Sequence, residues 1–475
     1  MNFLFTKLKF GWTPRAVWMA LMLLLFTGCD ESAEKMEWSP DGTQAAVLLR
    51  GDLRLSDPAG VLSTPIAHGV SHATWLPDGS GLVCIRSQYP ANWKEASSML
   101  ASEEVSTLEQ LAFALMGLLE NAIEVTDGNF DEIGDKFFAP LKIDSSEKLA
   151  AVLACLSHTQ SKPLKKLIGR AAKKQREQIE KEFSDIRKIR LHELFIARFD
   201  SNHSVDTRVL LCTADALGDA RPSPNAKSIA FTRESVLQLV SLEDQPVLFN
   251  TSSPVIGGLA WSQNSGSVFF ASPTSKWDSG KNNLSTVIRR DVVWEAGECK
   301  VGEDVIIAQI CSADPPRVRV LPDDRLIFQS LEIGFPLAQR AQTPNGFFVV
   351  SANPEDKERI KKIPARADLL PGDLSAYSVC PDGKRLALVD HESDAVRVVN
   401  IDSGEIKTIW PKGRGKSRTI PAWRGSKDLF FVALPNPNVV RPEWMQWSAD
   451  AGARVFSAHW ETEDLAPLMS VPVQE

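Results

Sequence analysis

A five-residue motif that recurs along most of the chain limits what the sequence can fold into. Its first copy is Trp38-Ser39-Pro40-Asp41-Gly42. Pro40 presets φ for the first corner of a type I turn, Asp41 tolerates the next corner, and Gly42 supplies a positive φ. Each copy leads into a short apolar run, as in Ala45-Ala46-Val47-Leu48-Leu49, which predicts the next strand of an antiparallel pair.

Further copies of the motif set a repeat. The clear ones are Trp75-Leu76-Pro77-Asp78-Gly79, Val320-Leu321-Pro322-Asp323-Asp324 and Val379-Cys380-Pro381-Asp382-Gly383. Degenerate ones are Pro222-Ser223-Pro224-Asn225-Ala226, Trp261-Ser262-Gln263-Asn264-Ser265 and Trp423-Arg424-Gly425-Ser426-Lys427. Four strands recurring about every 40–50 residues predict an all-β propeller of seven four-stranded blades, with six as the alternative. Large rings at the end of the innermost strands are expected to pack between blades: Trp38, Trp75, Trp261 and Trp423.

This turn and the strand after it resemble the TolB-like family of bacterial propellers, which are WD-type repeat proteins. The resemblance covers most of the chain outside residues 89–190. It implies a fold and leaves the function open, because one fold hosts many functions.

The N-terminus has the pattern of a lipoprotein signal peptide. A basic leader precedes an apolar run from Ala16 to Phe26, and Phe26-Thr27-Gly28-Cys29 resembles a lipobox, although Phe26 stands where Leu is usual. The expectation is cleavage after residue 28 and acylation of Cys29, with an uncleaved signal anchor as the alternative. More than one acyl chain gives stable membrane attachment. Asp30 resembles a signal for staying in the inner membrane, so we expect a lipid-anchored envelope protein that faces the periplasm or exterior.

The expected organisation is a signal peptide (1–28), a tether (29–35), blades 1 and 2 in part (36–88), an α-helical insertion (89–190) and the remaining propeller (191–475). The insertion shows helical spacing, for instance at Leu108, Leu111, Ala112 and Leu115. Further helices are expected over Glu147–Leu156 and from Pro163 toward Arg190. The insertion interrupts blade 2, so we expect it to cap or flank one mouth of the ring.

Charge within the insertion is divided by position. Acidic residues dominate from Ala91 to Glu147, and basic residues dominate from Lys162 to Arg190. The basic surface candidates are Lys165, Lys166, Arg170, Lys173 and Lys174. The simpler interpretation pairs them with the acidic half; the alternative is a site for anionic lipid or nucleic acid. The chain's net charge of −7 makes nucleic acid an unlikely partner.

Candidate chemistry is sparse. His68 and His72 have a spacing of four, which can hold a metal only on a helix, so they are weak candidates and no metal or cofactor is predicted. No Gly-x-Ser-x-Gly nucleophile motif occurs. Six cysteines besides Cys29 are expected to be small buried hydrophobes, with Cys299 and Cys311 as the one pair to test for a disulfide.

Three functions remain open at this stage. The first is a protein-binding or scaffold lipoprotein with an envelope protein as partner. The second is an envelope hydrolase or lyase for glycan or peptide, with its site in the central channel under the insertion. The third is a sensor of lipid surfaces. The oligomeric state is left open. Outward apolar residues on the insertion would favour the first, and converging carboxylates and histidines in the channel would favour the second.

Overall fold

The structure is a computed structural model. It describes residues 35–125, 141, 143, 145–170, 176, 188–199, 205–242, 247–276, 283–295, 298–312, 317–330, 332–334, 340–341, 346–353, 355–356, 360–365, 377–390, 395–410, 416–417, 419–434, 443–450 and 452–456. Its contacts divide the chain into a helical unit and a propeller unit. The helical unit contains Gln88–His192 and Cys212–Ala216; the propeller unit contains Ser32–Ser87, Glu193–Leu211 and Leu217–Glu475.

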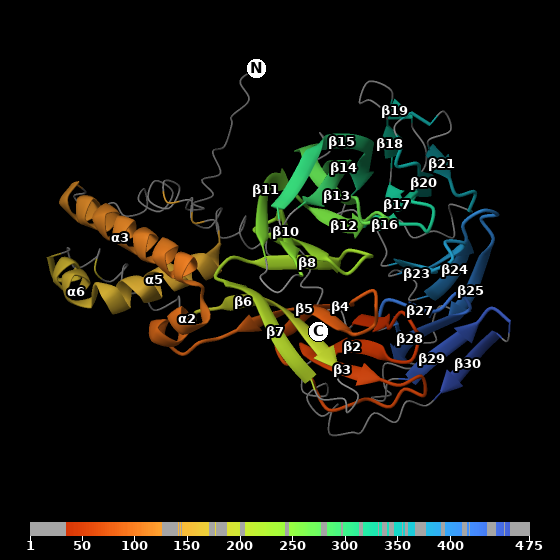
Figure 1. Cartoon of the computed structure of the whole chain (residues 1–475), viewed down its shortest axis with the longest axis horizontal. Helices are drawn as coiled ribbons and strands as arrows, with labels where there is room; N and C mark the ends of the chain where they lie inside the picture. Colours follow the sequence, from red (N-terminus) through yellow and green to blue (C-terminus); the bar gives the residue numbers. More distant parts are fainter. Residues whose placement is uncertain are drawn as a thin grey trace, which may run out of the picture. The chain divides into compact units, whose positions relative to one another are not determined.

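Seven antiparallel sheets form the seven blades of a β-propeller (Figure 1). Blade 1 contains β1 (Lys35–Trp38), β2 (Ala45–Leu49) and β3 (Asp52–Ser56). Blade 2 contains β4 (Val70–Trp75), β5 (Gly81–Gln88), β6 (Leu191–Phe199) and β7 (Val205–Thr213). Blade 3 contains β8 (Leu217–Pro222), β9 (Ser228–Arg233), β10 (Val236–Ser241) and β11 (Leu248–Pro254).

The other four blades follow in chain order. Blade 4 contains β12 (Gly257–Trp261), β13 (Ser267–Lys276), β14 (Asn283–Glu295) and β15 (Glu298–Ser312), with β18 (Glu332–Gly334) and β19 (Arg340–Ala341) added at its edge. Blade 5 contains β16 (Arg319–Val320), β17 (Leu326–Ser330), β20 (Gly346–Val350) and β21 (Ile360–Lys362). Blade 6 contains β22 (Tyr377–Val379), β23 (Arg385–Asp390), β24 (Ala395–Asn400) and β25 (Ile406–Trp410). Blade 7 contains β27 (Ala422–Arg424), β28 (Asp428–Leu434), β29 (Glu443–Ser448) and β30 (Gly452–Phe456), with β26 (Lys416–Ser417) beside β28.

The repeated motif forms the predicted turn between the first and second strands of each blade. Gly42, Gly79 and Gly383 have φ of 69°, 72° and 70°. The amide of Gly42 donates to the Ser39 carbonyl at 2.8 Å, which closes the turn. The Asp41 carboxylate accepts from the amide of Thr43 at 3.0 Å, and the corresponding Asp or Asn does the same in five further copies.

Ala226 occupies the glycine position of the blade 3 turn with φ of 54°. A left-handed conformation costs a residue with a Cβ about 1–2 kcal/mol, whereas glycine loses more backbone entropy on folding. We therefore expect Ala226→Gly to raise the free energy of unfolding by about 0.5–1 kcal/mol, measured by urea denaturation. The matched control is Gly42→Ala, which should lower it, because a Cβ there would lie 3.2 Å from Cγ of Arg424. A lower stability of Ala226→Gly would contradict the expectation.

The repeated tryptophans join neighbouring blades. The indole of Trp75 donates to the Glu37 carbonyl of blade 1 at 2.9 Å, and Trp261 donates to the Arg221 carbonyl of blade 3 at the same distance. Among the described residues of the propeller unit, buried apolar side chains form seven clusters, one between each pair of neighbouring blades. A sheet buried on both faces in this way explains why most second strands are continuous apolar runs.

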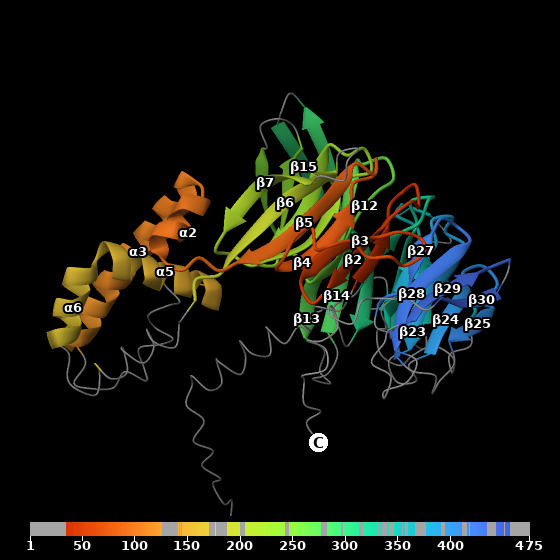
Figure 2. The same ribbon diagram turned by 90° about the horizontal axis from the view of Figure 1, so that it is seen from below.

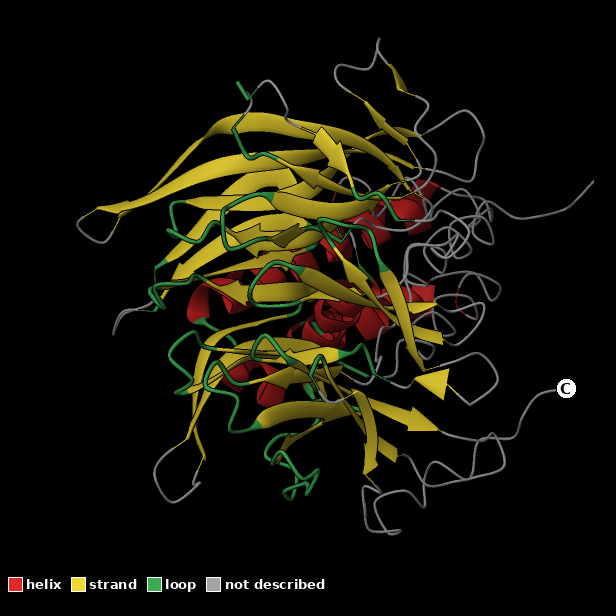
Figure 3. Cartoon of the chain, turned by 90° about the vertical axis from the view of Figure 1, so that its right-hand side faces the viewer, coloured by secondary structure: helices red, strands yellow, loops and turns green. Residues whose placement is uncertain are grey.

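Blade 7 packs directly against blade 1 and closes the ring. Met36, Trp38, Ala45 and Val47 share one core cluster with Ala422, Phe430 and Val432. The rings of Trp38 and Phe430 lie 4.8 Å apart, and Arg424 donates to the Gly42 carbonyl at 2.7 Å. In the described part of the chain each of these two blades keeps its own strands, so packing seals the ring. Figure 3 shows how completely strands make up the regular structure of these blades.

The apolar runs of the sequence predict a fourth strand of blade 1 at Leu62–Ile66, and in blade 4 a strand over Ser285–Arg289 followed by a less regular segment from Val292 to Ile310. Both expectations are wrong. Leu62–Ile66 does not form a fourth strand of blade 1; this segment contributes only the isolated bridge of Ser56 with Leu62, next to that of Leu53 with Ala67. In blade 4, Val292-Val293-Trp294 belongs to β14 and not to the fourth strand, because β14 and β15 form one hairpin paired from Asn283↔Ser312 to Glu295↔Glu298 (Figure 2). Polar residues are interspersed along both strands of this hairpin, so a search for continuous apolar runs does not predict its length.

The helical unit contains α2 (Trp93–Met99), α3 (Ser102–Val125), α5 (Ser146–Thr159) and α6 (Ser161–Arg170). Their apolar faces share one core, in which Leu108, Leu115, Val152 and Leu156 are buried. Asn92 caps α2 and Ser145 caps α5, each accepting a backbone amide. The helix α2 was not expected from the sequence, and α6 begins two residues before Pro163. Among the described residues, no helix is both long and apolar enough to cross a membrane.

Candidate functional site

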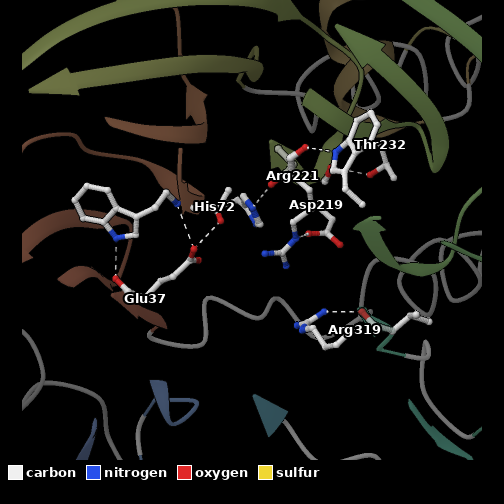
Figure 4. A network of polar contacts seen from close by, with 12 residues as sticks. Glu37, His72, Asp219, Arg221, Thr232 and Arg319 are labelled. Atoms are coloured by element: carbon white, nitrogen blue, oxygen red, sulfur yellow. Dashed lines mark hydrogen bonds and ion pairs between the residues drawn. The ribbon is translucent and has the colours of Figure 1, made fainter. Parts of the chain in front are cut away.

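The strongest gathering of charged groups lies on the innermost strands of the propeller. The residue before the repeated tryptophan position and the residue two places earlier share one face of a strand. In blades 1, 2, 3 and 5 these positions are polar, and Figure 4 shows the side chains of Glu37, His72, Asp219, Arg221 and Arg319 approaching one another from separate strands. We call the ionisable residues at these positions the axial cluster: Lys35, Glu37, His72, Asp219, Arg221, Arg317 and Arg319.

A β-bulge places Asp219 beside Arg221. Between Gly218 and Arg221 the register of β8 against β9 shifts, so the strand carries an extra residue there. Asp219 adopts a φ of 27°, whereas Gly258 holds the same position of blade 4 with φ of 70°. A positive φ at a residue other than glycine is strained, and such strain often accompanies function. The result is an ion pair in which Asp219 Oδ1 lies 2.9 Å from Arg221 Nε.

The charges around this pair set its protonation. Burial alone would raise the pKa of Asp219, but the positive charges of Arg221, Arg319 and Lys35 outweigh it and hold the pKa below its usual range. Burial alone would lower the pKa of Arg221, but Asp219 and Glu37 outweigh it and raise that pKa. Both groups therefore stay charged at neutral pH.

His72 lies on β4 and is only 6% exposed. Its Nε2 lies 2.8 Å from the Ala220 carbonyl, which can only accept, so Nε2 carries the proton. Burial, followed by the charges of Lys35 and Arg221, lowers the pKa of His72 to about 3. The imidazole is neutral across the physiological range.

Glu37 links blade 1 to blade 2. Its Oε1 accepts from the Thr74 hydroxyl at 2.8 Å and from the Trp75 amide at 3.3 Å. These bonds hold the carboxylate in place as an acceptor.

Two cations of the axial cluster have no carboxylate partner among the described residues. Among the described residues, the Lys35 ammonium group makes no hydrogen bond or ion pair, and the Arg319 guanidinium group donates only to the Val318 carbonyl, at 3.1 Å. Burial lowers the pKa of both groups, and the charge of Arg221 lowers them further. The neighbouring Tyr377 is buried, which raises its pKa to about 12.

This arrangement suits binding better than proton transfer. A general acid or base works best with a pKa near the operating pH, and His72 lies far below it. The described residues contain no group of three or more His, Cys, Asp or Glu that could hold a metal. Unpaired, partly buried cations attract an anion instead.

His68 and His72, the weak metal candidates of the sequence, do not form a common site. His68 is 75% exposed with Nδ1 2.7 Å from Asp52 Oδ1, whereas His72 lies within β4 and not in the loop. Cys299 and Cys311 lie near opposite ends of β15, about 40 Å apart along the strand, so they cannot form a disulfide with each other. Of the cysteines that the structure describes, five are buried and form no disulfide: Cys84, Cys155, Cys212, Cys299 and Cys380.

The other predicted residues divide between described and undescribed parts. The four repeat tryptophans are 5–7% exposed. Lys165, Lys166 and Arg170 are exposed on α6 without an ion pair among the described residues, whereas Arg190 of the basic segment lies 3.5 Å from Glu147 of the acidic one. Cys29, Lys173 and Lys174 lie outside the described residues.

Sequence reasoning missed most of the axial cluster. A signal was present, because Lys35, Glu37, Asp219, Arg221 and Arg319 all stand one or three places before the repeated tryptophan position. Reading those two positions across all seven copies would have identified blades 1, 2, 3 and 5 as polar at the axis.

Comparisons with known proteins find structural likeness only. No family model matches the sequence, and a search of curated proteins finds no match. Solved structures that resemble the chain include a putative TolB from Agrobacterium tumefaciens, with a TM-score of 0.36 and 13% identity over 53% of this chain and 84% of that one. Another is the Kuenenia stuttgartiensis hydrazine synthase, with a TM-score of 0.45 and 9% identity over 89% of this chain and 95% of that one. A third is the Cps50 (Swd1) β-propeller domain of Myceliophteria thermophila, with a TM-score of 0.43 and 8% identity over 85% of this chain and 93% of that one.

Proposed function

We propose that the chain is a non-catalytic binding lipoprotein of the bacterial envelope, in which the helical insertion supplies the surface for a protein partner. One observation carries the proposal: an apolar side chain points outward from a helix that has its own core. Phe113 of α3 is 73% exposed, although the same helix buries Leu108, Ala112 and Leu115. Exposed aromatic residues with low conformational entropy are frequent anchors of protein interfaces.

The anchoring part of the proposal rests on the sequence. The basic leader, the apolar run and Cys29 match a lipoprotein signal. An acylated Cys29 would hold the protein at a membrane, and Asp30 favours the inner one.

The alternative, an envelope enzyme, draws on the carboxylates and histidine of the axial cluster. Their protonation argues against it, because Asp219 stays ionised beside Arg221 and His72 stays neutral. Neither group is poised to exchange a proton near pH 7.

A cross-linked pull-down from membranes tests the proposal. The full-length protein, a Phe113→Ser variant and a Cys29→Ala variant are compared. The matched control is Val61→Ser, which removes another exposed apolar side chain, at 65% exposure on blade 1. We expect one discrete partner that Phe113→Ser loses and Val61→Ser retains, with Cys29→Ala released from the membrane fraction. Equal capture by the two serine variants would contradict the partner surface, and membrane retention of Cys29→Ala would contradict the anchor.

A variant that lacks the insertion gives a second readout. β5 and β6 are neighbours in one antiparallel sheet, so a short Gly-rich hairpin can replace residues 89–190. Leu191 and Cys212 belong to the helical core, so the variant also carries Leu191→Thr and Cys212→Ser to avoid exposing apolar surface. We expect a folded propeller that does not capture the partner.

A further inference from the structure

We propose that helix α6 binds the surface of a membrane that contains anionic lipid, through four exposed cations. The helix spans Ser161–Arg170 (Figure 2), and we call its exposed cations the basic face: Lys162, Lys165, Lys166 and Arg170. None of the four makes an ion pair among the residues that the structure describes. The proposal goes beyond the partner surface at Phe113, which belongs to a different helix.

The basic face lies opposite the side of α6 that packs into the helical core. Leu164 and Leu167 are 6% exposed and belong to that core. At about 100° per residue, the four cations occupy an arc of about 140° on the other side of the helix. Gly169 lies within this arc, and a Cβ added there would meet no atom within 4 Å. No described residue therefore covers the basic face at this point.

The basic face does not serve the stability of the helix. Like charges four residues apart repel each other on a helix surface, and Lys162 with Lys166 and Lys166 with Arg170 have this spacing. The first turn contains Lys162 and no acidic residue, which is unfavourable at the positive end of the helix dipole. Only Arg170, in the last turn, suits the dipole. A negatively charged surface outside the helix would offset this repulsion.

The neighbouring sequence does not neutralise the basic face. The segment from Lys162 to Arg190 contains 11 basic and 4 acidic residues, although the whole chain has a net charge of −7. Arg190 is paired with Glu147, 3.5 Å away. Arg176 donates to the Gly169 carbonyl at 3.1 Å, which places a further guanidinium group beside the end of α6. The positive charge is therefore concentrated at this helix.

An anionic membrane fits the basic face better than nucleic acid does. Clusters of four or more Lys and Arg on an amphipathic helix are typical of binding to anionic lipid, and each cation strengthens it about fivefold. Three of the four cations are lysines, which act as point charges, whereas arginine forks are favoured for nucleic-acid recognition. This choice also rests on the proposed anchor at Cys29, which would hold the chain at a membrane.

Flotation with lipid vesicles tests the proposal. The full-length protein carries Cys29→Ala, so the result does not depend on the anchor. Vesicles of phosphatidylcholine are compared with vesicles of equal parts phosphatidylcholine and phosphatidylglycerol. We expect stronger binding to the anionic vesicles, and about 0.5 M salt should abolish the difference. The triple variant Lys165→Gln, Lys166→Gln, Arg170→Gln should lower the affinity for anionic vesicles about 100-fold.

Two control variants make the result specific. Lys227→Gln, Lys361→Gln, Lys384→Gln removes the same charge from three exposed lysines of the propeller unit, and it should bind nearly as the unsubstituted chain does. Lys165→Arg with Lys166→Arg keeps the charge of α6 and should keep the binding. Circular dichroism verifies that each variant folds.

The outcomes separate the alternatives. Equal binding to both kinds of vesicle, or an equal loss in both triple variants, would overturn the proposal. A short DNA duplex that displaces the protein from anionic vesicles at an equal concentration of phosphate groups would overturn it in favour of nucleic acid. The pull-down of the Cys29→Ala variant uses membranes washed with the same salt, so that the anchor and the basic face are tested separately.

Discussion

Replacement of Trp38 by alanine is expected to lower the free energy of unfolding by about 3–5 kcal/mol, the usual range for a buried tryptophan. Trp38 is 6% exposed and belongs to the core shared by blades 7 and 1. Its ring lies 4.8 Å from that of Phe430, and the Arg424 guanidinium lies 5.3 Å above it. Because packing closes the ring here, the cavity would open the contact between the first and last blades. Urea denaturation followed by tryptophan fluorescence measures the change.

Two further variants make this result specific. Trp38→Phe keeps a large ring, so its free energy of unfolding should fall by less than half of the decrease expected for Trp38→Ala. Trp261→Ala creates an equivalent cavity between blades 3 and 4, so it should destabilise similarly, but without increasing proteolysis of the N-terminal blade. A Trp38→Ala protein as stable as the Val61→Ala control would refute this account of ring closure.

Acid should destabilise the propeller through His72. The unfolded imidazole titrates near 6.5, whereas burial and the charges of Lys35 and Arg221 lower the pKa in the folded protein to about 3. Between these values the unfolded state binds one more proton, so the stability that is present above pH 6.5 is lost as the pH falls. The loss should reach about 3 kcal/mol by pH 4, measured as the free energy of unfolding at each pH.

The test of this prediction compares two histidine variants. His72→Gln keeps a donor for the Ala220 carbonyl. It should reduce the slope of the unfolding free energy against pH by the equivalent of about one bound proton. The control His68→Gln changes an exposed imidazole and should leave the slope as it was. The unfolding free energy will still depend on pH in both variants, because His192 of the helical unit also takes up a proton on unfolding in acid. Burial, followed by the charge of Arg190, lowers its pKa to about 4. An identical slope in His72→Gln would exclude His72 as the source.

The repeat predicted the fold because local chemistry determines each copy. Proline, Asp or Asn, and a residue with positive φ specify the turn wherever they occur, so seven copies correctly predicted seven blades. Boundaries that depend on pairing were less predictable. Leu62–Ile66 contains Pro65, which has no amide hydrogen to donate to a ladder, and it forms only one isolated bridge, whereas the β14–β15 hairpin owes its length to cross-strand pairing.

The axial cluster was predictable only in part. The strand register fixes which residues face the axis, and the motif reveals that register. The pairing of Asp219 with Arg221 depends on a β-bulge, and the local sequence Leu217-Gly218-Asp219-Ala220 does not predict one. Only a comparison with Gly257-Gly258, where the register of blade 4 also shifts, would have suggested it. The environment that keeps His72 neutral comes from three blades far apart in sequence.

The position of the helical insertion affects how the propeller can form. About 100 residues separate β5 from the strand beside it, β6. As a flexible loop, a segment of that length would cost about 2 kcal/mol more to close than one of 10 residues. Helices with mostly local contacts form faster than sheets built from distant segments. An insertion that collapses early, around the core that also holds Leu191, would shorten the effective loop and bring the two strands together, so the helices would act as a folding aid for blade 2 during synthesis.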